Sequence, residues 1–201
     1  SNSGNLAITG AATFRTDAAE SNIALDSSGN VFSSAVTLQA DDGSEAFGNI
    51  TFVDSAAVDF DSSASANGDL YINASTDGAV GGNLSVTATT GNITQNVALA
   101  VTGTSTFITG ADGSNIILGN SGNVFTAAVT MKADTGGNEA FGNITFVDSA
   151  AVKLHSSAST GGDLFIDAGT DGAVGGDLSI TATIGNITQG VALTIGGTSA
   201  F

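Results

Sequence analysis

The sequence predicts an all-β protein folded as a right-handed parallel β-helix (β-solenoid), with about four coils in each repeat of ~94 residues. Two observations favour this fold: a long repeat that spans most of the chain, and a shorter pattern of strands and turns inside it. A third observation argues against helical folds. No segment has apolar residues at the helical spacing of three and four positions together with caps at both ends, so we expect no helices.

The long repeat is visible in one exact match. Residues 46–58, read AFGNITFVDSAAV, return unchanged as residues 140–152, 94 positions later. Residues 28–32 align with 121–125 at an offset of 93, so one residue is inserted within 133–139. One long unit has therefore been copied.

The ends of the chain share one phase of this repeat, because residues 1–14 align with 94–107 and with 188–201. We therefore divide the chain into the end of a preceding repeat (1–14), a first copy (15–107) and a second copy (108–201). We expect the copies to form one continuous solenoid that belongs to a longer array.

Short strands and turns fill each copy. Glycine or serine, then Asn or Asp, then alternating apolar residues recur in segments such as SNIAL (21–25), GNITF (48–52), GDLYI (68–72) and GNLSV (82–86). Alternation places every second side chain on one face of a strand, and Gly, Asn and Asp favour the turns between strands. The runner-up fold is a pair of β-sandwich domains, since short strands with turn signals suit both architectures.

The turns also set the size of one coil. The turns before Ile23, Ile50, Leu70, Ile93 and Ile116 lie 20 to 27 residues apart, which is the length of one solenoid turn. Inward side chains of successive coils should then stack into ladders. The large members that we expect in these ladders are Phe14, Phe32, Phe47, Phe52, Phe60, Phe107, Phe125, Phe141, Phe146 and Phe201.

Composition excludes two classes of partner. Three cationic residues face 19 carboxylates, for a formal net charge of −16. Such a surface repels nucleic acid and anionic membrane, and no apolar run is long enough to span a bilayer. The chain is not expected to be disordered, because its hydrophobic fraction of 41% is patterned. It has no cysteine, which is compatible with secretion in a fold stabilised by backbone ladders.

Catalysis is not expected. His155 is the only histidine, and it aligns with Asp61 of the first copy, which is typical of an outward, solvated position. A lyase acting on acidic polysaccharides would need a basic groove, but Arg15, Lys132 and Lys153 are far apart in sequence and none recurs in the other copy. We assign no catalytic and no cofactor-binding residue.

A calcium ion is the one cofactor that we consider. Glycine-containing loops hold Asp41, Asp42 and Glu45 in the first copy, and Asp134 and Glu139 in the second. Carboxylate oxygens suit Ca²⁺, although a solvated acidic turn explains the same residues. Asp59 and Asp61 alternate on one face but correspond to Lys153 and His155, so they do not predict a repeated metal site.

The segments GNLSVTATTGNITQNVALAVTGTSTF (82–107) and GDLSITATIGNITQGVALTIGGTSAF (176–201) resemble the repeats of large bacterial filamentous-haemagglutinin-like proteins, adhesins that are exported by two-partner secretion. The resemblance implies a right-handed β-helix shaft, extracellular or at the cell surface, that serves adhesion or cell-to-cell contact. The secretion domain that marks the family is not in this segment.

We therefore expect a structural solenoid that forms the shaft of a bacterial adhesin or surface filament. Its partners would be neighbouring repeats of the same chain, which we favour, or like subunits stacked end to end, and surface glycans or other cells. One alternative is a calcium-stabilised or carbohydrate-binding solenoid module. Another is a fibre subunit that assembles through its ends.

Overall fold

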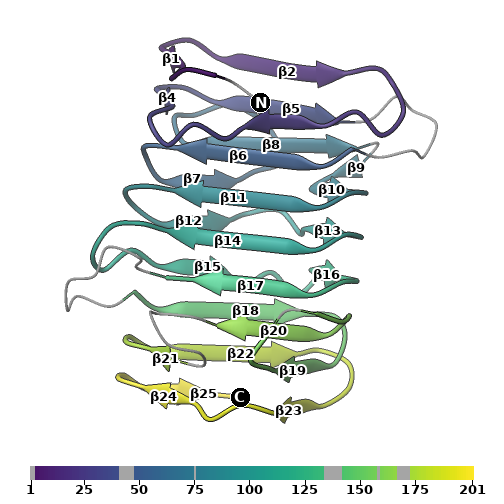
Figure 1. Ribbon diagram of the computed structural model, residues 1–201, viewed down its shortest axis with the longest axis vertical. Coiled ribbons are helices and arrows are strands. Elements are labelled where there is room, and N and C mark those ends of the chain that lie inside the picture. The colour runs from purple at the N-terminus through teal and green to yellow at the C-terminus, as the bar shows by residue number, and fades with distance from the viewer. Residues whose placement is uncertain (1–2, 41–47, 75, 134–141, 158, 167–172) are drawn as a thin grey trace.

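Two long sheets of stacked strands enclose one apolar core along the length of the molecule (Figure 1). The computed structural model describes residues 3–40, 48–74, 76–133, 142–157, 159–166 and 173–201, and these residues contain strands and turns but no helix. All pairs between the described strands are parallel except one. The prediction of an all-β parallel β-solenoid is confirmed.

The ten-stranded sheet is called sheet I here. Its order along the molecule is β2 (Ala12–Thr16), β5 (Val36–Ala40), β8 (Asp69–Ala74), β7 (Val58–Phe60), β12 (Ile93–Gln95), β15 (Ile116–Leu118), β18 (Ile144–Asp148), β22 (Leu178–Ala182) and β25 (Ser199–Ala200). The tenth strand, β9 (Thr76–Asp77), pairs antiparallel with β8.

The eight-stranded sheet is called sheet II. Its order, in the same direction, is β3 (Ile23–Leu25), β6 (Ile50–Asp54), β11 (Leu84–Ala88), β14 (Ser105–Thr109), β17 (Val129–Lys132), β20 (Asp163–Ile166), β19 (Val152–Leu154) and β23 (Ile187–Gln189).

Three narrow sheets of two-residue strands lie along the sides of the molecule. They are β1 (Ala7–Ile8) with β4 (Val31–Phe32), then β10 (Ala79–Val80) with β13 (Ala100–Val101) and β16 (Val124–Phe125), and finally β21 (Ala173–Val174) with β24 (Thr194–Ile195). In Figure 1 the first and third of these sheets lie on one side and the second lies on the other.

Equivalent strands of the two copies lie on opposite sheets. β2 belongs to sheet I, its counterpart β14 to sheet II, and the third equivalent, β25, to sheet I again. The cause is a fold-back: β7 and β8 follow each other in sequence yet pair within sheet I, and β19 and β20 do the same within sheet II. Elsewhere in the chain, successive long strands alternate between sheet I and sheet II. Each fold-back omits one such alternation, so each copy is rotated by about half a turn relative to the previous one.

The number of layers follows from the path along sheet I. From β2 to β25 the path makes eight strand-to-strand steps over two copies, hence four layers per copy. At a spacing of about 4.8 Å the eight steps span about 38 Å. The five predicted coil starts do not form one series: Ile23 and Ile50 pair in sheet II, whereas Leu70, Ile93 and Ile116 lie in sheet I.

Inward side chains form the expected ladders. Phe52, Phe60, Phe107 and Phe146 are fully buried, and Phe32 and Phe125 are nearly so. The geometry of neighbouring rings repeats between copies: Phe32 and Phe52 lie 5.2 Å apart at 30°, and Phe125 and Phe146 lie 5.3 Å apart at 33°. Phe14 is partly buried and Phe201 is 61% exposed in the last layer, whereas Phe47 and Phe141 lie outside the described residues.

The glycine–asparagine pairs of the sequence line one edge of sheet II in the first copy. The Oδ1 of Asn22 accepts a hydrogen bond from the N–H of Asn49, and the Oδ1 of Asn49 accepts one from the N–H of Asn83, so each Asn clamps the next layer. The preceding glycines allow close stacking. A Cβ on Gly48 would collide with the carbonyl oxygen of Ser21.

Candidate functional site

The region in which the two copies differ most in charge is the fold-back. In the first copy β7 pairs with β8 and places Asp59 beside Asp69. In the second copy β19 pairs with β20 and places Lys153 beside Asp163. The fold-back therefore brings together residues that are ten positions apart and that no single strand would align.

Three carboxylates converge in the first copy. Asp59, Asp61 and Asp69 each offer an oxygen atom, and these atoms lie within 4.8 Å of one another. Asp69 is buried, and its Oδ2 accepts hydrogen bonds from the N–H groups of Ser65 and Ala66 at 3.0 and 2.6 Å. Carboxylate oxygens at such separations are the ligand type that Ca²⁺ takes in proteins.

The negative charges of the three carboxylates repel one another. Burial raises the pKa of Asp59, as do the charges of Asp61 and Asp69, while a hydrogen bond from the Thr94 hydroxyl lowers it. Hydrogen bonds from the Ser63 N–H and the Asn96 amide lower the pKa of Asp61. The net result is a raised pKa for Asp59 and a lowered pKa for Asp61.

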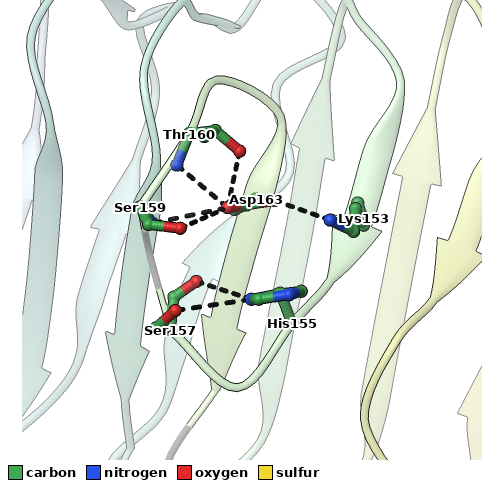
Figure 2. A network of polar contacts seen from close by, with 6 residues as sticks. All are labelled: Lys153, His155, Ser157, Ser159, Thr160 and Asp163. Carbon is green, nitrogen blue, oxygen red and sulfur yellow. Dashed lines mark hydrogen bonds and ion pairs between the residues drawn. The ribbon is translucent and has the colours of Figure 1, made fainter.

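The second copy carries its own cation at this place (Figure 2). The Lys153 ammonium lies 3.6 Å from Oδ1 of Asp163, whose side chain is 2% exposed. Oδ2 of Asp163 accepts hydrogen bonds from the N–H and hydroxyl of Thr160 and from the hydroxyl of Ser159. Burial raises the pKa of Asp163, but these hydrogen bonds outweigh it and lower the pKa to about 2. Asp163 is therefore ionised and paired.

His155 lies near the Asp163 network but makes separate contacts. Its Nδ1 is 3.1 Å from the carbonyl oxygen of Ser157 and 3.4 Å from the Ser157 hydroxyl. Figure 2 shows this pair apart from the Asp163 contacts. These contacts do not link His155 to a carboxylate among the described residues, and its side chain is partly exposed, in keeping with the predicted outward position.

The sequence singled out two further groups of residues, the calcium candidates and the three cations. Asp41, Asp42, Glu45, Asp134 and Glu139 lie outside the residues that the structure describes. The three cations are not gathered: Arg15 pairs with Asp17, and the Lys132 ammonium lies 5.8 Å from the centre of the Phe165 ring. The convergence of Asp69 with Asp59 and Asp61 was not predicted, because the sequence does not reveal the fold-back.

Comparison with known families adds one match. Residues 1–39 and 63–132, together more than half of the chain, match a family described as repeats of unknown function (DUF5649). The chain belongs to this family. Residues 1–39 are in phase with residues 94–132, so the matched segments of these repeats include two equivalent stretches.

No curated protein and no solved structure matches the chain. The family description assigns no function. Among the described residues, no helix has the length and apolar character that crossing a membrane requires.

Proposed function

We propose that this chain is a structural rod segment, without catalytic activity, in the shaft of an extracellular bacterial adhesin or surface filament. The observation that carries the proposal is the continuity of the core across the boundary between copies. Ile93 of the first copy pairs in register with Ile116 of the second, just as it pairs with Val58 of its own copy. Adding copies would lengthen the rod without changing its cross-section.

The surface supports the same role. The formal net charge of −16 keeps such rods apart in solution, and the charge differences between copies at the fold-back leave the buried ladders intact. The partners that fit are neighbouring repeats along the axis, with glycans or other cells as candidates for the target of the whole adhesin. The resemblance of residues 82–107 and 176–201 to adhesin repeats supports the proposed extracellular location and adhesive role.

Two measurements test the proposal. Small-angle scattering of chains that carry two and four copies should show a length that grows by about 19 Å with each added copy, for four strand steps, while the radius of gyration of the cross-section stays constant. An antibody against the chain should label intact cells of the source organism, and external protease should remove that label. A cross-section that widens as copies are added would contradict the rod, and a label that appears only after lysis would contradict the surface location.

A calcium-stabilised module is the alternative that a specific observation favours, namely the convergence of Asp59, Asp61 and Asp69. A ligand that binds only the folded state raises the melting temperature by mass action. Calcium should therefore raise the Tm of the wild type and leave that of an Asp59→Lys variant unchanged. A Tm that does not respond to millimolar calcium would exclude this alternative at the fold-back.

A further inference from the structure

The turn between β7 and β8 contains the one Asn-Gly dipeptide of the sequence, Asn67 with Gly68. In any asparagine, the side-chain carbonyl carbon can form a five-membered ring with the backbone nitrogen of the next residue. A Cβ on that next residue crowds the nitrogen, and glycine has no Cβ. By local sequence, Asn67 is therefore the asparagine that is most open to this ring closure.

The structure leaves the dipeptide accessible. Asn67 is exposed, and it takes the second position of a turn in which the N–H of Asp69 donates to the carbonyl of Ala66 at 3.3 Å. Gly68 takes the third position with a φ of 91°, which is typical of a type II turn. Among the hydrogen bonds of the described residues, none uses the N–H of Gly68 or the carboxamide of Asn67. The reacting groups are thus free to meet.

The asparagines at the edge of sheet II are held in a different way. The Oδ1 of Asn49 accepts a hydrogen bond from the N–H of Asn83, and the Oδ1 of Asn83 accepts one from the N–H of Thr104. The nitrogen that would attack is also engaged. The N–H of Ile50 donates to the carbonyl of Asn83, and the N–H of Leu84 donates to the carbonyl of Thr104, both at 2.9 Å. Ring closure at these asparagines would break contacts between layers.

We propose that Asn67 is a site of spontaneous deamidation in the folded protein, with water as the reactant. The nitrogen of Gly68 loses its proton and attacks Cγ of Asn67, the bond from Cγ to Nδ2 breaks, and Nδ2 takes up that proton and leaves as ammonia. Water then opens the cyclic imide, at Cγ to give aspartate or at the backbone carbonyl to give isoaspartate. One water is consumed and one ammonia is released, without oxidation or reduction. The proposal does not depend on the rod function.

Either product should change the fold-back. Aspartate adds a carboxylate two positions from Asp69, which already lies in a cluster with Asp59 and Asp61. Isoaspartate adds one backbone carbon immediately before Gly68, whose carbonyl accepts a hydrogen bond from the N–H of Asp59 at 2.9 Å. Asp59 and Asp69 are the first residue pair between β7 and β8. We therefore expect the modification to loosen the pairing of these two strands.

The second copy has the same turn without the reactive amide. The N–H of Asp163 donates to the carbonyl of Thr160 at 3.0 Å, and Gly162 has a φ of 80°. Gly161 stands at the position of Asn67. Deamidation would therefore make the two fold-backs diverge with time. The variant Asn67→Gly, which gives the first copy the dipeptide of the second, is the matched control.

Peptide mass spectrometry of the folded chain tests the proposal. After incubation at mildly alkaline pH, chymotrypsin cuts after Phe60 and Tyr71 and releases a peptide in which Asn67 is the only asparagine. The mass gain that accompanies amide-to-carboxyl exchange should appear there at least about tenfold faster than in peptides with Asn49 or Asn83, because those asparagines require local opening. Chromatography separates the aspartate and isoaspartate forms. An unchanged Asn67 in the folded chain, or equally fast conversion of Asn49 or Asn83, overturns the proposal.

Stability after incubation tests the consequence for the fold-back. The denaturant midpoint of the wild type should fall as Asn67 is converted, whereas that of Asn67→Gly should stay constant over the same period. Circular dichroism before incubation checks that the variant keeps the fold. A midpoint that falls equally in both proteins, or that stays constant in a converted wild type, would overturn the loosening of β7 and β8.

Discussion

The ammonium of Lys153 lies 3.6 Å from the buried carboxylate of Asp163, while the residue equivalent to Lys153 in the first copy is Asp59, beside Asp69. One backbone arrangement thus holds an ion pair in one copy and a group of carboxylates in the other. Because the same position carries opposite charges in the two copies, a substitution in one copy can be compared with the reverse substitution in the other.

Exchanging these residues should change stability in opposite directions. In EDTA and low salt, Asp59→Lys should raise the free energy of unfolding by about 0.5 kcal/mol, because it replaces repulsion by a surface ion pair. Lys153→Asp should lower it by about 1 kcal/mol or more, because Asp163 loses its cation and gains a like charge. Denaturant unfolding measures both. Equal shifts of the same sign would contradict the electrostatic explanation.

The buried carboxylates Asp54 and Asp148 predict a pH dependence. Each accepts a hydrogen bond at 3.1 Å, from the N–H of Phe32 and of Phe125, yet burial raises both pKa values above the usual 3.8. Folding then favours the protonated form, and this contribution is complete below pH 3.8 and lost as the pH rises through the folded-state pKa.

The check is the difference between a variant and the wild type. The free energy of unfolding of Asp54→Asn, relative to the wild type, should increase from pH 4 to pH 7, and Asp148→Asn should show the same slope. Other titrating groups cancel in this difference. A relative stability that is flat or falls with pH would show that the hydrogen bonds outweigh burial.

Gly142 should tolerate no side chain. A Cβ at this position would collide with the carbonyl oxygen of Ser114 in the layer below. We expect Gly142→Ala to cost about 1–3 kcal/mol in the free energy of unfolding, because layers in register cannot separate locally. Gly119→Ala is the matched control, since its Cβ would meet only the Thr145 methyl at 3.6 Å. Similar melting temperatures for both variants would refute this account.

Asn123 should stabilise the side of the rod. It is fully buried, its Oδ1 accepts a hydrogen bond from the N–H of Leu99 at 2.9 Å, and its amide donates to the carbonyl of Leu118 at 3.3 Å. Asn123→Ala leaves these buried groups unpaired and should cost about 1–3 kcal/mol. The exposed Asn186 serves as control, with an expected change within about 0.5 kcal/mol for Asn186→Ala. Equal thermal unfolding of the two variants would argue against a role for the buried amide.

Local pattern was enough to predict the strands, the inward faces and most of the phenylalanine ladder. The alternation of apolar residues predicts that the side chains of Ile50 and Phe52 both point inward. The long repeat predicts that Phe125 and Phe146 pack as Phe32 and Phe52 do. These features depend on neighbours within one strand or on equivalence between copies, and both are visible in the sequence.

The arrangement of strands between sheets was not predictable in the same way. β7 and β8 read as two ordinary strands, and nothing in the spacing of Phe60 and Leu70 says that they pair within one sheet. The acidic group at Asp59 depends on that pairing. The alignment of Asp59 with Lys153 argued against a metal site common to both copies. It did not reveal that Lys153 is the ion-pair partner of Asp163.

The half-turn between copies means that any outward feature of the repeat is displayed alternately on opposite sides of the molecule, at intervals of about 19 Å for four layers. A target that recognises one copy would find the next recognition site facing away from it. Such a molecule is suited to bridging two surfaces, each in contact with every second copy, and not to lying flat along one of them.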